Sequence, residues 1–127
     1  MGPLLKAGYL PVVSSIGMDA SGGLLNLNAD DAAAGIAGAV GASRLVLLTD
    51  VPGIKGGDGV LRPTLTASQV EAMIASGEIT GGMIVKARSA VAAGRAAGAA
   101  VVIMSGETPD ALLRYLAGGS VGTTITG

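Results

Sequence analysis

Short apolar runs that are typical of buried strands alternate along this chain with longer stretches that are typical of helices. Residues 44–48 read Arg-Leu-Val-Leu-Leu, and residues 100–104 read Ala-Val-Val-Ile-Met. Continuous aliphatic runs of this length are typical of strands buried on both faces, so we interpret 44–48 as a central parallel strand. A helical stretch at 83–97 separates the two runs. This alternation predicts an α/β fold with a mainly parallel sheet.

Residue types at the ends of the helical stretches indicate where the helices begin and end. Asn28 is a favoured N-cap residue, with Asp31 three positions later, and it predicts a helix over 29–40 that Gly41 ends. A capping-box pattern opens a second helix over 66–76. The helix over 83–97 ends in the same way as the first one, because glycine follows it.

The remaining segments predict shorter elements. Residues 10–13 (Leu-Pro-Val-Val) suit a short buried strand, and the glycine-rich turn at 17–23 predicts a hairpin that resumes at Leu24. The other expected elements are a flexible turn at 55–59, a helix over 110–116 with Thr108 as N-cap and Pro109 at N1, and a last strand at 122–125.

Composition excludes several classes of function. The 127 residues, enough for about one domain, include no His and no Cys. This absence excludes Ser–His and Cys nucleophiles, His-ligated zinc, thiol redox chemistry and disulfides. Half of the residues are hydrophobic (50%) and only 13% are charged, a balance that suits a chain whose surface is partly covered by a partner.

Charge and hydropathy patterns bear on partners and location. The eight Lys and Arg residues are scattered and the net charge is −1, so we expect no nucleic-acid partner. The longest uncharged stretches, 32–43 and the tail after Arg114, are shorter than the roughly 20 apolar residues of a membrane span. The first residues have no basic leader followed by an apolar block. We therefore expect a cytoplasmic protein without a membrane segment.

Three segments place polar groups where a ligand could bind. Residues 26–31 bring two amides and two carboxylates to a helix start, and 49–54 place a polar pair and a Pro-Gly turn after a strand. In open α/β sheets, ligands bind beyond the carboxyl ends of strands. Residues 81–86 open a helix with two glycines followed by Lys86, and helix amino ends attract phosphate.

Each segment also has a purely structural interpretation. Asn28 and Asp31 suffice as an ordinary helix cap, although Asn26 and Asp30 are not needed for one. Residues 49–54 suit a simple exit from a strand, and Lys86 could be a solvated surface lysine. Neither a Walker A loop nor a G-x-G-x-x-G dinucleotide motif is present.

Taken together and in this order, the segments resemble the amino acid kinase family, and within it the branch that phosphorylates N-acetylglutamate. The residues that carry the likeness are 10–17 (Leu-Pro-Val-Val-Ser-Ser-Ile-Gly), 26–30 (Asn-Leu-Asn-Ala-Asp), 47–54 (Leu-Leu-Thr-Asp-Val-Pro-Gly-Ile), 79–86 (Ile-Thr-Gly-Gly-Met-Ile-Val-Lys) and 122–125 (Gly-Thr-Thr-Ile). The resemblance covers nearly the whole chain. It implies a three-layer αβα sandwich that binds ATP or ADP.

The resemblance also implies roles for individual residues. Lys86 would neutralise the transferring phosphoryl group, Asp30 would hold the catalytic lysines, and Asn26 would contact N-acetyl-L-glutamate. The adenine and ribose site would be lined by Asp50, Val51, Gly53, Ile54, Ile79 and Thr80. Magnesium would come with the ATP phosphates, and no protein metal site is implied.

Family members have two lobes, and this sequence resembles only the carboxyl-terminal, nucleotide-binding one. The resemblance therefore implies that a second lobe, which binds most of the acyl amino acid, is absent from residues 1–127; it also allows a homo-oligomer. Two alternatives stay open. One is a related kinase that acts on aminoadipate or glutamate held by a carrier protein. The other is a nucleotide-binding module that does not catalyse phosphoryl transfer.

Overall fold

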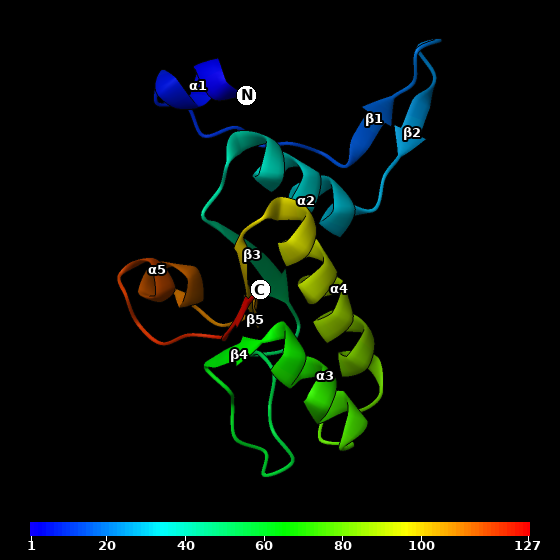
Figure 1. Cartoon of the computed structure of the whole chain (residues 1–127). Helices are drawn as coiled ribbons and strands as arrows, with labels where there is room; N and C mark the ends of the chain where they lie inside the picture. Colours follow the sequence, from blue (N-terminus) through cyan, green and yellow to red (C-terminus); the bar gives the residue numbers. More distant parts are fainter.

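The computed structural model describes residues 1–127 and contains six strands and five helices (Figure 1). The elements in chain order are α1 (Gly2–Lys6), β1 (Ile16–Met18), β2 (Leu24–Asn26), α2 (Ala29–Val40), β3 (Arg44–Thr49), β4 (Thr64–Thr66), α3 (Ala67–Ala75), α4 (Gly82–Ala97), β5 (Ala100–Ser105), α5 (Ala111–Leu116) and β6 (Thr123–Thr126). None of the helices is both long enough and apolar enough to cross a membrane.

The main sheet has four strands in the order β3-β5-β6-β4. β3 runs parallel to β5, with Arg44 opposite Ala100 and Thr49 opposite Ser105, and β4 runs parallel to β6. Only the contact between β5 and β6 is antiparallel. The expected mainly parallel sheet is therefore confirmed. β1 and β2 form a separate antiparallel hairpin.

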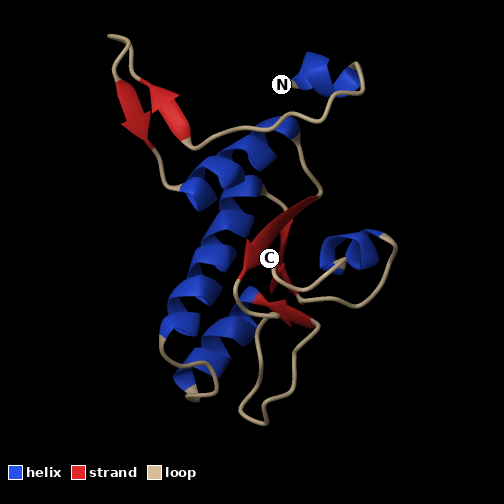
Figure 2. Cartoon of the chain, turned by 180° about the vertical axis from the view of Figure 1, so that it is seen from behind, coloured by secondary structure: helices blue, strands red, loops and turns tan.

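Helices cover both faces of this sheet, as Figure 2 shows from behind. On β5, Val101 and Ile103 belong to the main core beneath α2, α3 and α4, whereas Val102 and Met104 pack with Ala111 of α5 on the other face. This division follows from the strand geometry, because successive side chains point to opposite faces. The three-layer αβα arrangement is confirmed.

Small residues and the expected caps position α2 and α4. Asn28 Oδ1 accepts hydrogen bonds from the backbone N–H groups of Asp30 and Asp31, at 2.9 and 3.1 Å, and Gly41 ends α2 in the left-handed region. A Cβ on Gly38 would lie 3.2 Å from the backbone oxygen of Ala96. The two helices can therefore approach closely because their contact is built from Ala and Gly.

β3 lies at an edge of the sheet, which corrects the expectation that 44–48 is a central strand buried on both faces. It pairs only with β5, and Leu48 keeps 56% of its surface exposed. The apolar run is real, but no strand in this chain pairs with its other edge. An apolar run predicts that a strand will be buried, but it does not predict which element or partner will cover it.

Two further expectations about element boundaries were wrong. Residues 10–13 form no strand, because the hairpin instead pairs Ile16–Met18 with Leu24–Asn26 across a turn held by Asp19. Helix α5 begins at Ala111 with Asp110 as its N-cap residue in a left-handed conformation (φ 57°), so Thr108 is not the N-cap. The short elements α1 and β4 were not predicted.

The first 27 residues include no buried residue. Their apolar side chains form what we call the amino-terminal apolar segment, residues 4–27. Its most exposed members are Leu10 (89%) and Val12 (95%). The other members are Leu4, Leu5, Tyr9, Val13, Ile16, Met18, Leu24, Leu25 and Leu27. Exposed apolar surface in this amount indicates an interaction site.

Candidate functional site

Two cavities flank the point where the carboxyl end of β3 meets the first turns of α4. We call the first the Lys86 cavity; it has a volume of about 570 Å³. Its polar lining residues are Asn28, Asp30, Thr49, Lys86 and Ser89. The second, the glycine-rich cavity, measures about 530 Å³. Its lining residues are Val51, Pro52, Gly53, Lys55, Gly56, Gly57, Gly59, Gly77, Glu78, Ile79, Thr80 and Met83.

Lys86 and Asp50 form an ion pair at the junction of the two cavities. Lys86 Nζ donates a hydrogen bond to Asp50 Oδ1, although the two residues are 36 positions apart in sequence. Asp50 directly follows β3 between Thr49, which lines one cavity, and Val51, which lines the other. The hydrogen bond from Lys86, assisted by the lysine charge, lowers the pKa of the Asp50 carboxyl below its ordinary value.

The pKa of Asp50 offers a direct test of this pair. Replacing Lys86 with alanine is expected to raise the Asp50 pKa back toward its ordinary value, measured by NMR titration of the carboxyl carbon. The pKa of Asp50 is lower in the folded chain than its ordinary value, so the pair stabilises the fold at pH values above that ordinary pKa. This stabilisation is lost as the pH falls through the lowered pKa of Asp50.

Arg88→Ala provides the matched control for that titration. Arg88 also lies on α4, and its guanidinium lowers the pKa of Glu71 rather than that of Asp50. The control is therefore expected to move only the Glu71 titration. An Asp50 pKa that is the same with and without Lys86 would contradict the ion pair.

The amino end of α4 offers unpaired backbone donors beside Lys86. Gly81 precedes the helix at φ 56°, and no side chain caps this end. A Cβ at Gly81 or Gly82 would meet nothing within 4 Å, so the backbone is open to a ligand. A helix amino end carries a partial positive charge and free N–H groups, and a nearby lysine adds a point charge. The arrangement suits a phosphate.

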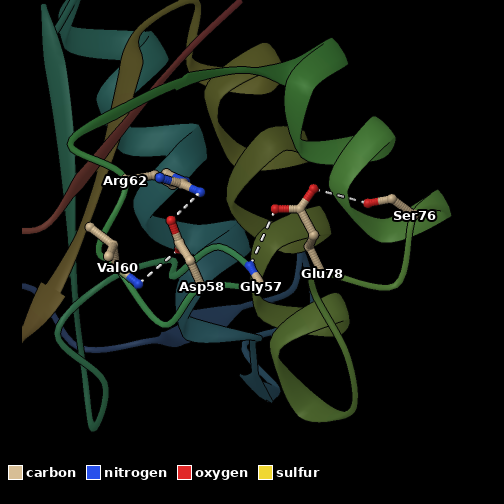
Figure 3. A network of polar contacts seen from close by, with 6 residues as sticks. All are labelled: Gly57, Asp58, Val60, Arg62, Ser76 and Glu78. Atoms are coloured by element: carbon tan, nitrogen blue, oxygen red, sulfur yellow. Dashed lines mark hydrogen bonds and ion pairs between the residues drawn. The ribbon is translucent and has the colours of Figure 1, made fainter.

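Backbone makes up most of one wall of the glycine-rich cavity. Gly56 N–H donates to the Val60 carbonyl at 2.9 Å, and Lys55 bridges to Leu61, so residues 55–61 form a closed loop. Asp58 accepts hydrogen bonds from Val60 N–H and from the Arg62 guanidinium (Figure 3). The expected flexible turn at 55–59 is thus a hydrogen-bonded loop.

Thr123 holds the base of this loop, and sequence reasoning gave it no role. Its Oγ1 accepts a hydrogen bond from Ile54 N–H at 2.8 Å and donates one to the Arg62 carbonyl at 2.7 Å, and the residue is fully buried. A Cβ on Gly53 (φ 144°) would lie 2.7 Å from this hydroxyl. A glycine is therefore required where the loop leaves β3.

The structure brings most of the predicted site residues together in two groups. Asp30 and Lys86 line the Lys86 cavity, and Val51, Gly53, Ile79 and Thr80 line the glycine-rich cavity. Asp50 joins the groups through its ion pair, and Asp30 forms no ion pair with Lys86. Besides Asp50, which lines neither cavity, two further predicted residues lie outside both linings.

These two residues are Ile54 and Asn26. The Ile54 side chain is fully buried in the core and does not reach the cavity. Ile54 can therefore affect the cavity only through its backbone, at the start of the loop. Asn26 ends β2, next to the amino end of α2, and its side chain is exposed. Glu78 and Lys55 line the glycine-rich cavity without having been predicted. Neither stood in a motif, so only the fold reveals them.

The donors at the site fit a nucleotide better than a metal held by the protein. No group of three or more Asp, Glu, His or Cys side chains comes together that could hold a metal ion. The uncapped α4, the open glycines and Lys86 are all suited to phosphate oxygens.

Comparison with known sequences finds a family model and curated relatives that match this chain. The sequence matches the model of the amino acid kinase family over residues 1–105. It is 48% identical over 123 residues to the acetylglutamate kinase of Aeromonas salmonicida, covering 97% of this chain and 47% of that protein. It is 49% identical to the acetylglutamate kinase of Pectobacterium atrosepticum, covering 96% of this chain and 47% of the relative. The chain spans about half the length of the curated relatives it matches.

Solved structures with the same fold include a synthase and a kinase. An N-acetylglutamate synthase from Neisseria gonorrhoeae, complexed with coenzyme A and N-acetyl-glutamate, superimposes with a TM-score of 0.85 at 30% identity. That match covers 99% of this chain and 30% of the synthase. A carbamate kinase from Giardia lamblia bound to AMP-PNP has a TM-score of 0.56 at 23% identity, over 87% of this chain and 36% of that one, and supports the fold alone.

Proposed function

This chain belongs to the amino acid kinase family, and we propose that it supplies the nucleotide-binding half of an acetylglutamate kinase. The complete enzyme would act in the cytoplasm, in arginine biosynthesis. A carboxylate oxygen of the N-acetyl-L-glutamate side chain would attack the γ-phosphorus of ATP, giving an acyl phosphate and ADP. The observation that carries this proposal is Lys86, paired with Asp50 beside the uncapped start of α4, at the junction of two cavities.

The reaction suits a site without histidine or cysteine. The attacking carboxylate is already ionised at neutral pH, so the reaction needs no general base. Phosphoryl transfer then depends mainly on positioning and on stabilising negative charge. Lys86 and the N–H groups of α4 supply that charge stabilisation. Mg²⁺, bound with the nucleotide, would neutralise phosphate charge further.

The remaining predicted residues take roles that match their positions. Val51, Gly53, Ile79 and Thr80 would bind adenine and ribose in the glycine-rich cavity. Asp30 would orient Lys86 across the Lys86 cavity once phosphate displaces Asp50. Asn26 would contact the acetylglutamate from the hairpin, beside the cavity that holds Asp30.

A complementary half would cover the amino-terminal apolar segment. In this chain the segment has nothing buried, and the edge of β3 that does not face β5 is unpaired. The curated relatives are about twice as long as this chain, so they contain a second half that could cover both features. The complete site would then lie between this chain and its complement.

The likeness to a synthase favours a second candidate function. The Neisseria structure matches almost all of this chain, yet its name is not that of a kinase. Under this alternative the chain is a ligand-binding module that does not transfer phosphoryl groups. A kinase that acts on carrier-bound aminoadipate or glutamate would differ mainly in the complementary half.

Calorimetric titration of the purified chain with Mg-ADP tests the proposal. We expect a dissociation constant in the micromolar range, weakened about tenfold by Lys86→Ala, because a charge-assisted contact to phosphate is lost. Lys6→Ala, a change in α1 away from both cavities, is the matched control and is expected to bind like the unsubstituted chain. Equal binding by all three proteins would contradict the role of Lys86.

A further inference from the structure

Glu78, on the connection between α3 and α4, bonds to a loop that lies 21 residues away in sequence. Gly57 N–H donates a hydrogen bond to Glu78 Oε2 at 3.2 Å, and Ser76 Oγ donates one to Glu78 Oε1 at 3.1 Å (Figure 3). Gly57 and Glu78 both line the glycine-rich cavity. A Cβ on Gly57 would lie 3.3 Å from Glu78 Cγ, so the side chain also packs directly against the loop.

Among the hydrogen bonds of residues 55–61, this is the one that reaches a residue outside the range 54–62. The bonds from Gly56 to Val60, from Gly59 to Gly56 and from Val60 to Asp58 are internal to the loop, and the Arg62 guanidinium at the base also donates to Asp58. The base is held differently, because the buried Thr123 bonds to both of its ends. The loop therefore has a rigid base, and its tip is held by Arg62 from that base and by the exposed Glu78 carboxylate from the connection between α3 and α4.

We propose that Glu78 is a positioning residue for the nucleotide. Through its hydrogen bond to Gly57, which we call the latch, it holds residues 55–61 in place at the glycine-rich cavity and so sets the affinity of that cavity for ADP. The inference rests on the proposed function and deepens it. A free tip would have to be ordered each time a nucleotide binds, and ordering backbone costs binding free energy. Glu78 lines the cavity that does not contain Lys86, so the latch acts on nucleotide affinity rather than on phosphoryl transfer.

Two substitutions at this position separate the latch from a general charge effect. Glu78→Ala removes the acceptor, whereas Glu78→Gln keeps an oxygen that can accept the Gly57 hydrogen bond without the charge. Glu107→Ala is the matched control, because Glu107 is an exposed carboxylate on the loop before α5 and lines neither cavity. Hydrogen exchange of the Gly57 amide reports the latch without any nucleotide, and calorimetry with Mg-ADP reports affinity.

We expect Glu78→Ala to speed exchange of the Gly57 amide about tenfold and to weaken ADP binding about fivefold or more. Glu78→Gln is expected to stay within about twofold of the unsubstituted chain in both measurements, and Glu107→Ala to match it. Thermal unfolding midpoints within a few degrees of each other would show that all variants fold.

Three other results would each contradict a different part of this proposal. Faster Gly57 exchange with unchanged ADP affinity would show that the latch exists but does not serve the nucleotide. Equal weakening by Glu78→Ala and Glu78→Gln would assign the effect to charge and overturn the latch. A protected Gly57 amide in a chain that binds no ADP would overturn the proposed function itself, and with it the role of Glu78.

Discussion

Replacing Lys86 with alanine in an enzyme reassembled from this chain and a complementary half is expected to lower kcat by about a thousandfold or more. In a reaction without a general base, the positive charge near the transferring phosphoryl group is the main contribution that a side chain can make. Before nucleotide binds, the ion pair with Asp50 holds Lys86 at the junction of the two cavities. Steady-state kinetics with saturating ATP and N-acetyl-L-glutamate would measure the loss.

Two further variants define what that loss means. Arg95→Ala removes a cation from the last turn of the same helix, outside both cavities, and is expected to leave kcat unchanged. Lys86→Arg keeps the charge but not the compact ammonium group, so an intermediate rate is expected. A decrease of less than about tenfold for Lys86→Ala would refute a catalytic role and favour the non-catalytic module.

Local sequence signals predicted α2 and α3 with their caps, because the causes of these elements are local. Asn28 bonds to N–H groups two and three residues away, and Thr66 and Gln69 cap each other within a single turn. The strand at residues 10–13 failed for the opposite reason. Its apolar pattern was read correctly, but strand formation needs a partner, and the hairpin pairs Ile16–Met18 instead.

The same distinction separates the predicted site residues from those that were missed. Lys86 follows Gly81 and Gly82 by about one helical turn, so the suitability of this helix start for phosphate could be inferred from the sequence. Thr123 bonds to a partner 69 positions away, and Glu78 to one 21 positions away. Such contacts depend on the packing of β6 and α3 beside the loop after β3. No spacing rule in the sequence could have revealed them.

The isolated chain is expected to have negligible kinase activity, and adding the complementary half of an acetylglutamate kinase relative is expected to raise the rate by a factor of about a thousand or more. Only the complete enzyme would hold the acceptor carboxylate in line with the nucleotide. Coupled detection of ADP release, with and without the second half, would measure this gain. Robust turnover by the 127-residue chain alone would contradict the need for a complement.

The amino-terminal apolar segment decides whether a restored rate comes from docking on this chain. Val12→Asp places a charge where 95% of the side chain is exposed, so the isolated chain should fold and bind Mg-ADP as before. If the complement covers this segment, the buried unpaired carboxylate would prevent association and abolish the gain in rate. Leu116→Asp, an exposed change on α5 in the opposite layer, should leave complementation intact. Full complementation by the Val12 variant would show that the exposed apolar surface serves something other than assembly of the kinase.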